Sequence, residues 1–257
     1  MSELFSIQLQ NRQQQGRDGV WLDLPTTTEQ VQAALRQIGI SSDNPQGLFI
    51  SGYFAEEEKR FAIPYNMVLA SNVDELNFLA SRLETLSTGE RAELNAALQA
   101  PQSELFSIGR ITDFPENVDY YVHLPDVHGP AQLGDYYLNR SGMVDMPEEW
   151  KGGIDTAQFG RYVAQQEQGV FTEYGYLVKS GDVWQKVHEG QPVPEEYRVL
   201  SFPVPEVMRD AANIPPPVQP ETEPQKVIPI ILNGKDSAER MKEITDRLET
   251  GIQQLFD

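Results

Sequence analysis

The apolar residues of this 257-residue chain switch repeatedly between strand-like and helix-like spacing, which restricts the fold to one that mixes small sheets with short helices. Residues 3–10 and 18–25 have the composition of short strands, and the polar, glycine-containing segment between them predicts a hairpin. Residues 47–54 and 59–65 predict a second strand pair. Between the two pairs, apolar residues recur at helical spacing, at Val31, Ala34, Leu35 and Ile38.

The spacing becomes helical after Asn72. Residues 72–100 contain two short helical periods that we expect to be broken at Thr88-Gly89, each with acids near its start. Strand-like segments follow at residues 103–111, 118–125, 170–180 and 182–189, with helical segments at residues 131–142 and 155–167. The order predicts a helical module between two α+β modules.

The hexapeptide SELFSI occurs at residues 2–7 and again at residues 103–108. Each copy is predicted to begin a strand, after which a second strand ends in Leu-Pro and a helix ends near a glycine. These landmarks are Leu24-Pro25 with Gly39, and Leu124-Pro125 with Gly142. Identity elsewhere is negligible, so duplication and coincidence both remain open as the origin of the hexapeptide.

Proline is concentrated in residues 201–225, which is typical of an extended linker. Beyond it, a strand-like piece precedes an amphipathic helix with Met241, Ile244, Leu248 and Ile252 along one face. Three roles remain possible for that helix: it docks on the body, it mediates oligomerisation, or it is the start of a further domain. We predict an α+β fold with modules at 1–66, 67–101 and 102–190, a linker at 191–225, and a strand and helix segment at 226–257.

Acids outnumber bases in residues 1–100, 101–200 and 201–257 alike, and the net charge is −19. Such a chain repels nucleic acid and attracts basic surfaces. It has no cysteine, which excludes disulfides, thiol nucleophiles and cysteine metal sites. Without a membrane-spanning run or a signal segment, we expect a cytoplasmic protein that does not bind membranes.

No catalytic motif stands out. His123 and His128 flank Asp126 at a spacing that fits neither a zinc protease nor a zinc finger. Residues 233–238 lack the glycine loop of a phosphate-binding motif, and no G-x-S-x-G is present. We therefore expect no enzyme activity, no metal and no cofactor. The acid clusters are open to two interpretations, a solvated surface or an imitation of DNA phosphates toward a basic groove.

Several stretches resemble the ArdA antirestriction family of plasmids and conjugative transposons. Residues 19–25 (GVWLDLP) are similar to the family's strand ending in Trp-x-Asp-Leu-Pro, and residues 71–86 resemble its central helical segment. The most specific match is residues 142–163 followed by residues 169–177, which are similar to the antirestriction motif. The resemblance covers about residues 4–180, with the pieces in the right order.

The resemblance implies an elongated, three-module, dimeric DNA mimic that occupies the DNA groove of the methyltransferase core of type I restriction-modification enzymes. The acids that we assign to target binding are Glu56, Glu57, Glu58, Asp74, Glu75, Glu84, Glu90, Glu93, Asp119, Asp126, Asp135, Asp145, Glu148, Glu149 and Asp155. The residues that we assign to the motif or to dimer contact are Gly142, Met143, Val144, Met146, Pro147, Trp150, Ile154, Gly160 and Arg161. Core packing is the alternative role for the apolar ones.

The sequence departs from the family motif at Thr156 and Phe159, where the family usually has Tyr, and at Tyr162, which replaces an Asp. Residues 228–256 instead resemble the opening helix of an ArdC-type single-stranded-DNA-binding domain. Two alternative functions follow, an accessory or scaffold protein of conjugative transfer, and an inhibitor of another DNA-bound defence complex.

Overall fold

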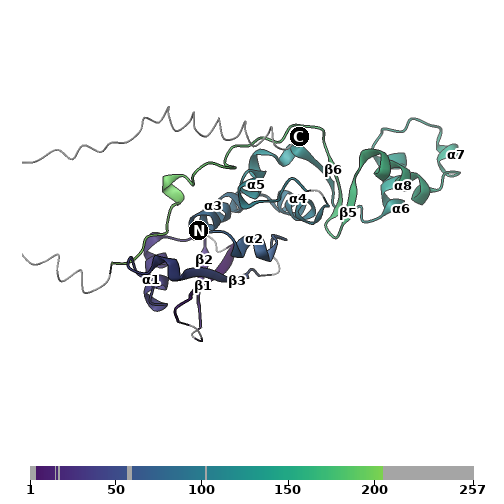
Figure 1. The fold of residues 1–257 in the computed structure, drawn as a ribbon. Coiled ribbons are helices and arrows are strands. Elements are labelled where there is room, and N and C mark those ends of the chain that lie inside the picture. The colour runs from purple at the N-terminus through teal and green to yellow at the C-terminus, as the bar shows by residue number, and fades with distance from the viewer. Residues whose placement is uncertain (1–3, 15, 17, 57–59, 102, 205–257) are drawn as a thin grey trace, which may run out of the picture. The chain divides into compact units, whose positions relative to one another are not determined.

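Strand Phe5–Asn11 (β1) is the central strand of an antiparallel sheet in the computed structural model (Figure 1). Val20–Leu24 (β2) pairs along one side of β1 and Leu48–Phe54 (β3) along the other. The predicted hairpin of the first two strands is therefore confirmed. The structure describes residues 4–14, 16, 18–56, 60–101 and 103–204, all within the unit Met1–Asn213 that contacts define.

The two faces of this sheet differ in polarity. Alternate residues of β1 are buried, at Phe5, Ile7 and Leu9, while Ser6, Gln8 and Gln10 lie on the other face. That outer face also carries Trp21 and Phe54, whose rings meet edge to face with centroids 6.4 Å apart. One face of the sheet thus joins the core and the other meets solvent.

The predicted strand at residues 59–65 is wrong, since residues 60–64 form no strand and β3 pairs with β1 instead. The Ala62 N–H donates to Asn95 Oδ1 (2.8 Å), and Asn95 Nδ2 donates to the Arg60 carbonyl (3.2 Å). A helical side chain therefore satisfies backbone groups that a neighbouring strand would otherwise pair with.

Helix Thr28–Gln37 (α1) begins with a capping box. The Gln30 N–H donates to Thr27 Oγ1 (3.4 Å) and the Thr27 N–H donates to Gln30 Oε1 (3.2 Å). After the helix Gly39 has φ +68°, the left-handed conformation expected past a helix end. The predicted apolar face is buried, at Val31, Ala34, Leu35 and Ile38.

The next helices are Tyr65–Leu69 (α2), Val73–Glu84 (α3) and Thr88–Gln99 (α4). The predicted pair of helices is confirmed, but the break lies at residues 85–87, because Ser87 caps α4 by accepting the Glu90 N–H (3.4 Å). Short 3-10 turns occur at Pro45–Gly47 (η1), Phe114–Glu116 (η3), Val118–Tyr120 (η4) and Glu195–Tyr197 (η6).

The second copy of the hexapeptide, residues 103–108, forms no strand, so that prediction is wrong. Ser107 Oγ accepts the Arg110 N–H (3.3 Å) and caps helix Ile108–Thr112 (α5). The Glu104 carboxylate accepts hydrogen bonds from the Arg110 guanidinium (3.1 Å) and the Lys179 ammonium (2.9 Å). The polar residues of this copy thus start a helix and hold an ion cluster.

A second antiparallel sheet has the order β4-β6-β5. Its strands are Tyr121–Leu124 (β4), Val170–Thr172 (β5) and Gly175–Lys179 (β6). The predicted strand segments at residues 118–125 and 170–180 are confirmed, and the latter folds into a β5-β6 hairpin. Together the two small sheets and the helices confirm the predicted α+β class.

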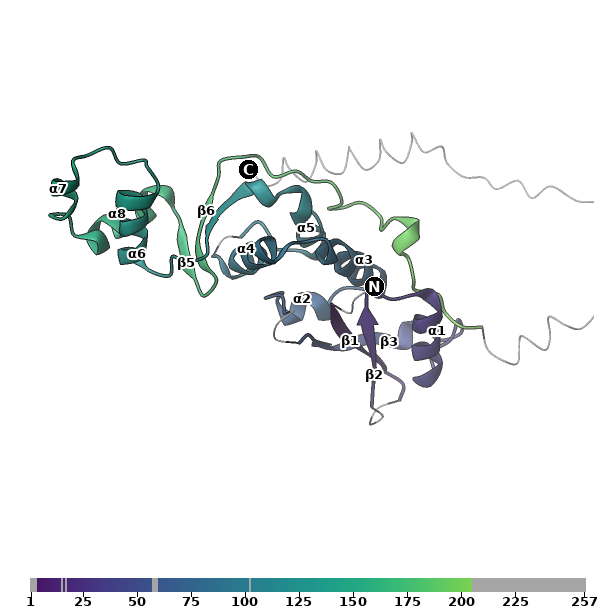
Figure 2. The same cartoon turned by 180° about the vertical axis from the view of Figure 1, so that it is seen from behind.

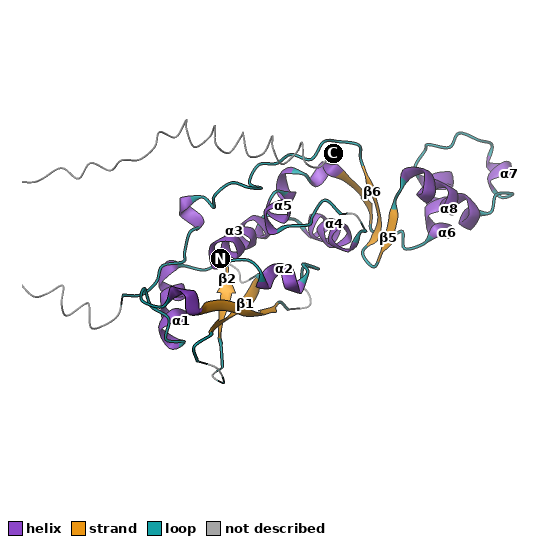
Figure 3. Ribbon diagram, viewed as in Figure 1, coloured by secondary structure: helices purple, strands orange, loops and turns teal. Residues whose placement is uncertain are grey.

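Helices Pro130–Asp135 (α6) and Thr156–Glu167 (α8) pack against each other, as Figure 3 shows. The π-helical turn Tyr136–Arg140 (η5) extends α6, and Glu148–Lys151 (α7) lies in the loop before α8. Both predicted helical segments are therefore confirmed. Around them a small second core contains Val127, Leu133 and Tyr176.

Residues 181–204, named here the C-terminal strap, run along α3 and α5 (Figure 2). The predicted strand at residues 182–189 is wrong. Asn117 Oδ1 accepts the Gln185 N–H (2.7 Å) and Asn117 Nδ2 donates to the Gln185 carbonyl (2.9 Å), so a side chain takes the place of a strand partner.

The larger core draws residues from the first sheet, the middle helices and the strap, among them Leu9, Leu79 and Val199. It therefore crosses the predicted boundaries between modules. The greater part of the predicted linker, from residue 205, and the predicted helix of residues 226–257 lie outside the described residues.

Candidate target-binding surface

Asp74, one of the predicted target-binding acids, uses its carboxylate inside the molecule. Its Oδ1 accepts the backbone N–H groups of Val199 (2.8 Å) and Leu200 (2.7 Å) in the strap. Hydrogen bonds to a charged acceptor are among the stronger ones in proteins. The negative charge of Asp74 is therefore directed toward the strap.

Glu75 and Glu90 have the same local role in two neighbouring helices. Each occupies the third helical position of a capping box, with Asn72 and Ser87 as the caps. The Glu75 carboxylate accepts the Asn72 N–H at 3.4 Å, and the Glu90 carboxylate accepts the Ser87 N–H at 2.7 Å. The hydrogen bonds with Ser87 hold the pKa of Glu90 below its ordinary value.

Glu93 is half-buried, and its Oε1 has no hydrogen-bond partner among the described residues. Burial, and then repulsion from the neighbouring carboxylates of Glu90 and Asp119, together raise the pKa of this carboxyl to about 8. The fold thus brings these three predicted acids close enough to repel one another. Near neutral pH, Glu93 is mostly protonated and contributes little negative charge.

The remaining predicted acids differ in exposure and in partners. Asp135 forms an ion pair with Arg140 (2.7 Å), and Glu148 forms one with Lys151 (2.6 Å). Asp155 caps α8 by accepting the Ala157 and Gln158 N–H groups. The exposed members of the set are Glu56, Asp119, Asp126, Asp145, Glu148, Glu149 and Asp155; Glu84 is half-buried, and Glu57 and Glu58 lie outside the described residues.

Four of these acids lie in a single segment, residues 142–155, named here the motif loop. It starts at Gly142, which has φ +70°, and includes α7. Its acids are Asp145, Glu148, Glu149 and Asp155. Met143 is 76% exposed and Trp150 is 65% exposed, so this loop offers two large apolar side chains beside its carboxylates.

The other motif residues have different environments. Pro147 is exposed and immediately precedes α7, and Arg161 is exposed on α8. The half-buried ones are Val144, Met146 and Ile154.

Gly160 in α8 has a clear structural role. A Cβ atom at this position would lie 1.8 Å from the Pro130 carbonyl oxygen of α6, and one at Gly134 would lie 1.9 Å from the Thr156 carbonyl oxygen. The two helices therefore touch backbone to backbone through a pair of glycines, which no other residue type would allow at this distance. This contact holds α8 in place at the end of the motif loop.

The family model of antirestriction protein (ArdA) matches residues 15–178, which is more than half of the chain. The chain belongs to the ArdA antirestriction family. The matched segment contains every predicted target-binding and motif residue. Members of the ArdA family are antirestriction proteins, and restriction enzymes are accordingly the class of target that the family suggests. No curated protein matches the chain.

Within this ArdA family member, sequence patterns missed a cluster that supports the motif. The hydroxyl groups of Tyr137 and Tyr176 both donate hydrogen bonds to the Glu167 carboxylate, the latter at 3.0 Å. Burial and then the bond to Glu167 raise the pKa of both hydroxyls. The cluster joins η5, α8 and β6, and no local spacing in the sequence indicates it.

The strap lies beyond the end of the ArdA match but packs on residues inside it. In the part of the chain that the structure describes, no three His, Asp or Glu side chains approach closely enough to bind a metal ion. His123 instead bonds through Nε2 to the Tyr174 carbonyl oxygen (2.8 Å). None of the described helices combines the length and apolar character needed to cross a bilayer.

Proposed function

We propose that this ArdA family member is an acidic DNA mimic that binds in the DNA groove of a type I restriction-modification enzyme and inhibits it competitively. The observation that carries the proposal is the ArdA match over residues 15–178 in a chain with a net charge of −19. The family indicates the class of target, and the carboxylates supply the chemistry of recognition.

A groove that binds duplex DNA must hold about one negative charge per 1.7 Å of helix axis. It does so with arginine and lysine side chains, which bind carboxylates through the same charge-assisted hydrogen bonds that they make with phosphates. A protein surface dense in exposed carboxylates can therefore compete for that groove without resembling DNA in its covalent structure.

The exposed acids are the best candidates for this contact. Asp119, Asp126, Asp145 and Glu149 combine exposure with the absence of any ion pair to a described lysine or arginine. Asp74 is bound to the strap and Glu93 is mostly protonated, so we assign them a smaller share. We therefore expect the target to contact only a subset of the acids.

We further propose that the protein acts as a homodimer in the cytoplasm, where restriction enzymes meet incoming DNA. The exposed Met143 and Trp150 of the motif loop support a contact between two copies, because large apolar side chains are costly to leave in water. The main body is not expected to bind nucleic acid, since its net charge repels phosphate.

The test is competition. The protein is titrated against a type I methyltransferase core that holds labelled duplex DNA, at about 50 mM and about 200 mM salt. We expect stoichiometric displacement of the DNA that weakens steeply at the higher salt concentration, because the contact is between charges. A folded protein that displaces no DNA at either concentration would rule the proposal out.

A set of neutral variants separates charge from shape. Neutralising exposed acids is expected to weaken displacement in steps, whereas replacing exposed amides by alanine leaves it unchanged. The acidic set is Asp126→Asn, Asp145→Asn and Glu149→Gln, and the control set is Gln158→Ala, Gln165→Ala and Gln166→Ala, all at exposed positions. Equal effects of both sets would show that charge is not what the target recognises.

A further inference from the structure

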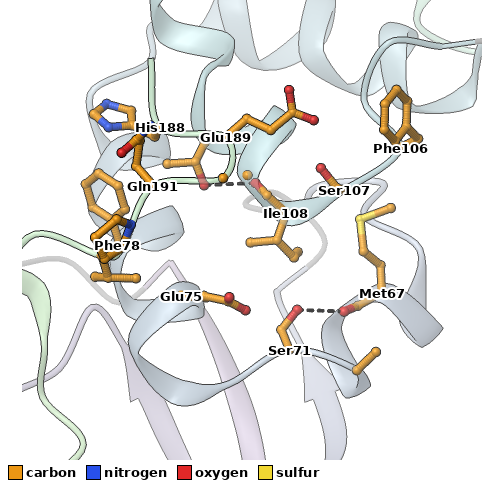
Figure 4. A pocket seen from close by; sticks show the side chains of 16 residues that line it. Met67, Ser71, Glu75, Phe78, Phe106, Ser107, Ile108, His188, Glu189 and Gln191 are labelled. Carbon is orange, nitrogen blue, oxygen red and sulfur yellow. Dashed lines mark hydrogen bonds between the residues drawn. The ribbon is translucent and has the colours of Figure 1, made fainter. Parts of the chain in front are cut away.

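A cavity of about 550 Å³ lies between the middle helices and the strap (Figure 4). Met67 of α2 and Ala70, which directly follows α2, line one side, and Glu75 and Phe78 line it from α3. The segment before and within α5 and residues 188–193 of the strap close the other sides. Its volume lies within the usual range for ligand-binding cavities in proteins.

The walls of the cavity are mostly apolar and are firmly supported. Phe78 packs against the rings of His188 and Tyr197, with centroids 4.9 and 4.7 Å away. Phe106 stands at the rim, 62% exposed, with the Arg110 guanidinium 4.8 Å from its ring centre. Aromatic walls of this kind favour aliphatic stems and planar cations.

Two carboxylates line the cavity, and they differ in their partners. Glu189 forms ion pairs with Arg110 (2.9 Å) and Lys186 (3.3 Å), and its interaction with Arg110 is the main cause that lowers its pKa. Among the described residues, the Glu75 carboxylate accepts only the long bond from the Asn72 N–H, and no lysine or arginine of that part of the chain pairs with it. Figure 4 shows the Glu75 carboxylate directed into the cavity, between Ser71 and Ile108.

We propose that this cavity receives an arginine side chain of the partner protein, with the guanidinium on Glu75 and the aliphatic stem along Met67 and Phe78. A guanidinium matches a carboxylate in a two-bond geometry, and its stem gains from burial against apolar walls. The volume leaves room for an apolar neighbour of that arginine. The identity of the partner rests on the proposed function, because a DNA-binding groove is the surface that would present such arginines.

The probe is a fluorescein-labelled, amidated peptide of sequence Gly-Leu-Arg-Leu-Gly, compared with the same peptide carrying citrulline in place of arginine. Citrulline keeps the shape and removes the charge. We expect saturable binding of the arginine peptide to the full chain in fluorescence anisotropy, and binding of the citrulline peptide at least about tenfold weaker.

The structure offers a matched pair of variants. Glu75→Gln and Glu90→Gln each alter the third position of a capping box, where glutamine also serves, so both should fold. Of these two glutamates, only Glu75 lines the cavity. Glu75→Gln is expected to weaken binding of the arginine peptide about tenfold, and Glu90→Gln to leave it unchanged.

Four results would overturn the inference: no saturable binding, equal binding of both peptides, equal losses in both variants, or binding that vanishes on concentrating the protein because a second copy fills the cavity. The peptide assay uses the isolated protein, so it is independent of inhibition. Peptide binding without DNA displacement would refute the proposed function alone, and displacement without peptide binding would refute this inference alone.

Discussion

The fully buried carboxylate of Asp113 accepts a hydrogen bond from the backbone N–H of His188, with Oδ1 and the nitrogen 2.6 Å apart. Its other oxygen accepts the Glu189 N–H at 3.2 Å. Asp113 follows directly after α5, so these bonds attach the strap to the helical part of the core.

The first prediction concerns this attachment. Asp113→Asn replaces one acceptor oxygen by an NH₂ group that would face a backbone donor. We expect a loss of about 2 kcal/mol in the free energy of unfolding, measured by urea titration, because a buried donor loses its partner. The exposed Asp126→Asn is the control and should change stability by less than about 0.5 kcal/mol. Similar losses in both variants would show that the strap is not held at Asp113.

The second prediction concerns the contact of α6 with α8. Gly160→Ala places a methyl group against the Pro130 carbonyl oxygen, so the helices must separate. We expect a loss of about 1–3 kcal/mol in thermal or urea unfolding. Gly152→Ala in the motif loop is the control, since a Cβ there meets nothing within 4 Å. A larger loss of stability in Gly152→Ala than in Gly160→Ala would show that the backbone contact between α6 and α8 does not stabilise this region.

The third prediction is a pH dependence at Glu93, whose pKa is raised from 4.5 to about 8 in the folded protein. The folded state holds this proton more tightly than the unfolded chain does. The stability from Glu93 is therefore fully present below pH 4.5, declines as the pH rises, and is lost above about pH 8.

Glu93→Gln carries no such proton, so it should gain stability relative to the parent protein as the pH rises from about 6 to about 9. We expect a gain of about 1 kcal/mol, because water screens a half-buried carboxyl. Urea unfolding at both pH values measures it, with the exposed Glu149→Gln as the control that stays parallel to the parent. A gain for Glu93→Gln that is independent of pH would contradict the assignment.

The fourth prediction compares the same position in the two hexapeptides. Phe5 is 2% exposed on the inner face of β1, whereas Phe106 is 62% exposed at the cavity rim. Phe5→Ala should therefore cost about 3–5 kcal/mol of stability, and Phe106→Ala about 0.5 kcal/mol or less. Urea unfolding of the two variants measures both losses of stability. Comparable losses would contradict the exposed position of Phe106.

The same two residues show how far local sequence determines this fold. The described residues of the first copy, 4–7, lead into and begin strand β1, whereas the identical residues 105–108 lead into a capped helix. The difference arises because β1 has strand partners on both sides, and residues 103–108 pair with no described strand. The helices of ten or more residues, α1, α3, α4 and α8, were predictable, since their caps and apolar spacing lie within a few residues of each other, whereas the short helices α2, α5 and α7 were not predicted. Two of the three false strands, at residues 59–65 and 182–189, contain backbone groups that are bound by distant side chains, those of Asn95 and Asn117.

The sequence predicts that the surface is acidic, but it does not predict which individual acids are free to contact a target. Sequence alone does not distinguish Asp74, which binds two backbone N–H groups of the strap, from the exposed Asp126. Nor does it show that Asp119 lies near Glu93, since that proximity depends on how α4 packs, whereas Glu90 lies three residues before Glu93 on the same helix and is a neighbour that helical spacing predicts. Gly160 is different, because its place in the family motif already indicated its importance, and the structure shows the backbone contact that explains it.

The position of the strap determines where this chain can be truncated without loss of the fold. The ArdA match ends at residue 178, and a fragment ending there would keep the whole motif while leaving the Asp113 carboxylate without its two amide donors and Phe78 without the rings of His188 and Tyr197. Such a fragment is expected to aggregate rather than to fold. The folding boundary of this protein lies past the family boundary, at residue 204 or later.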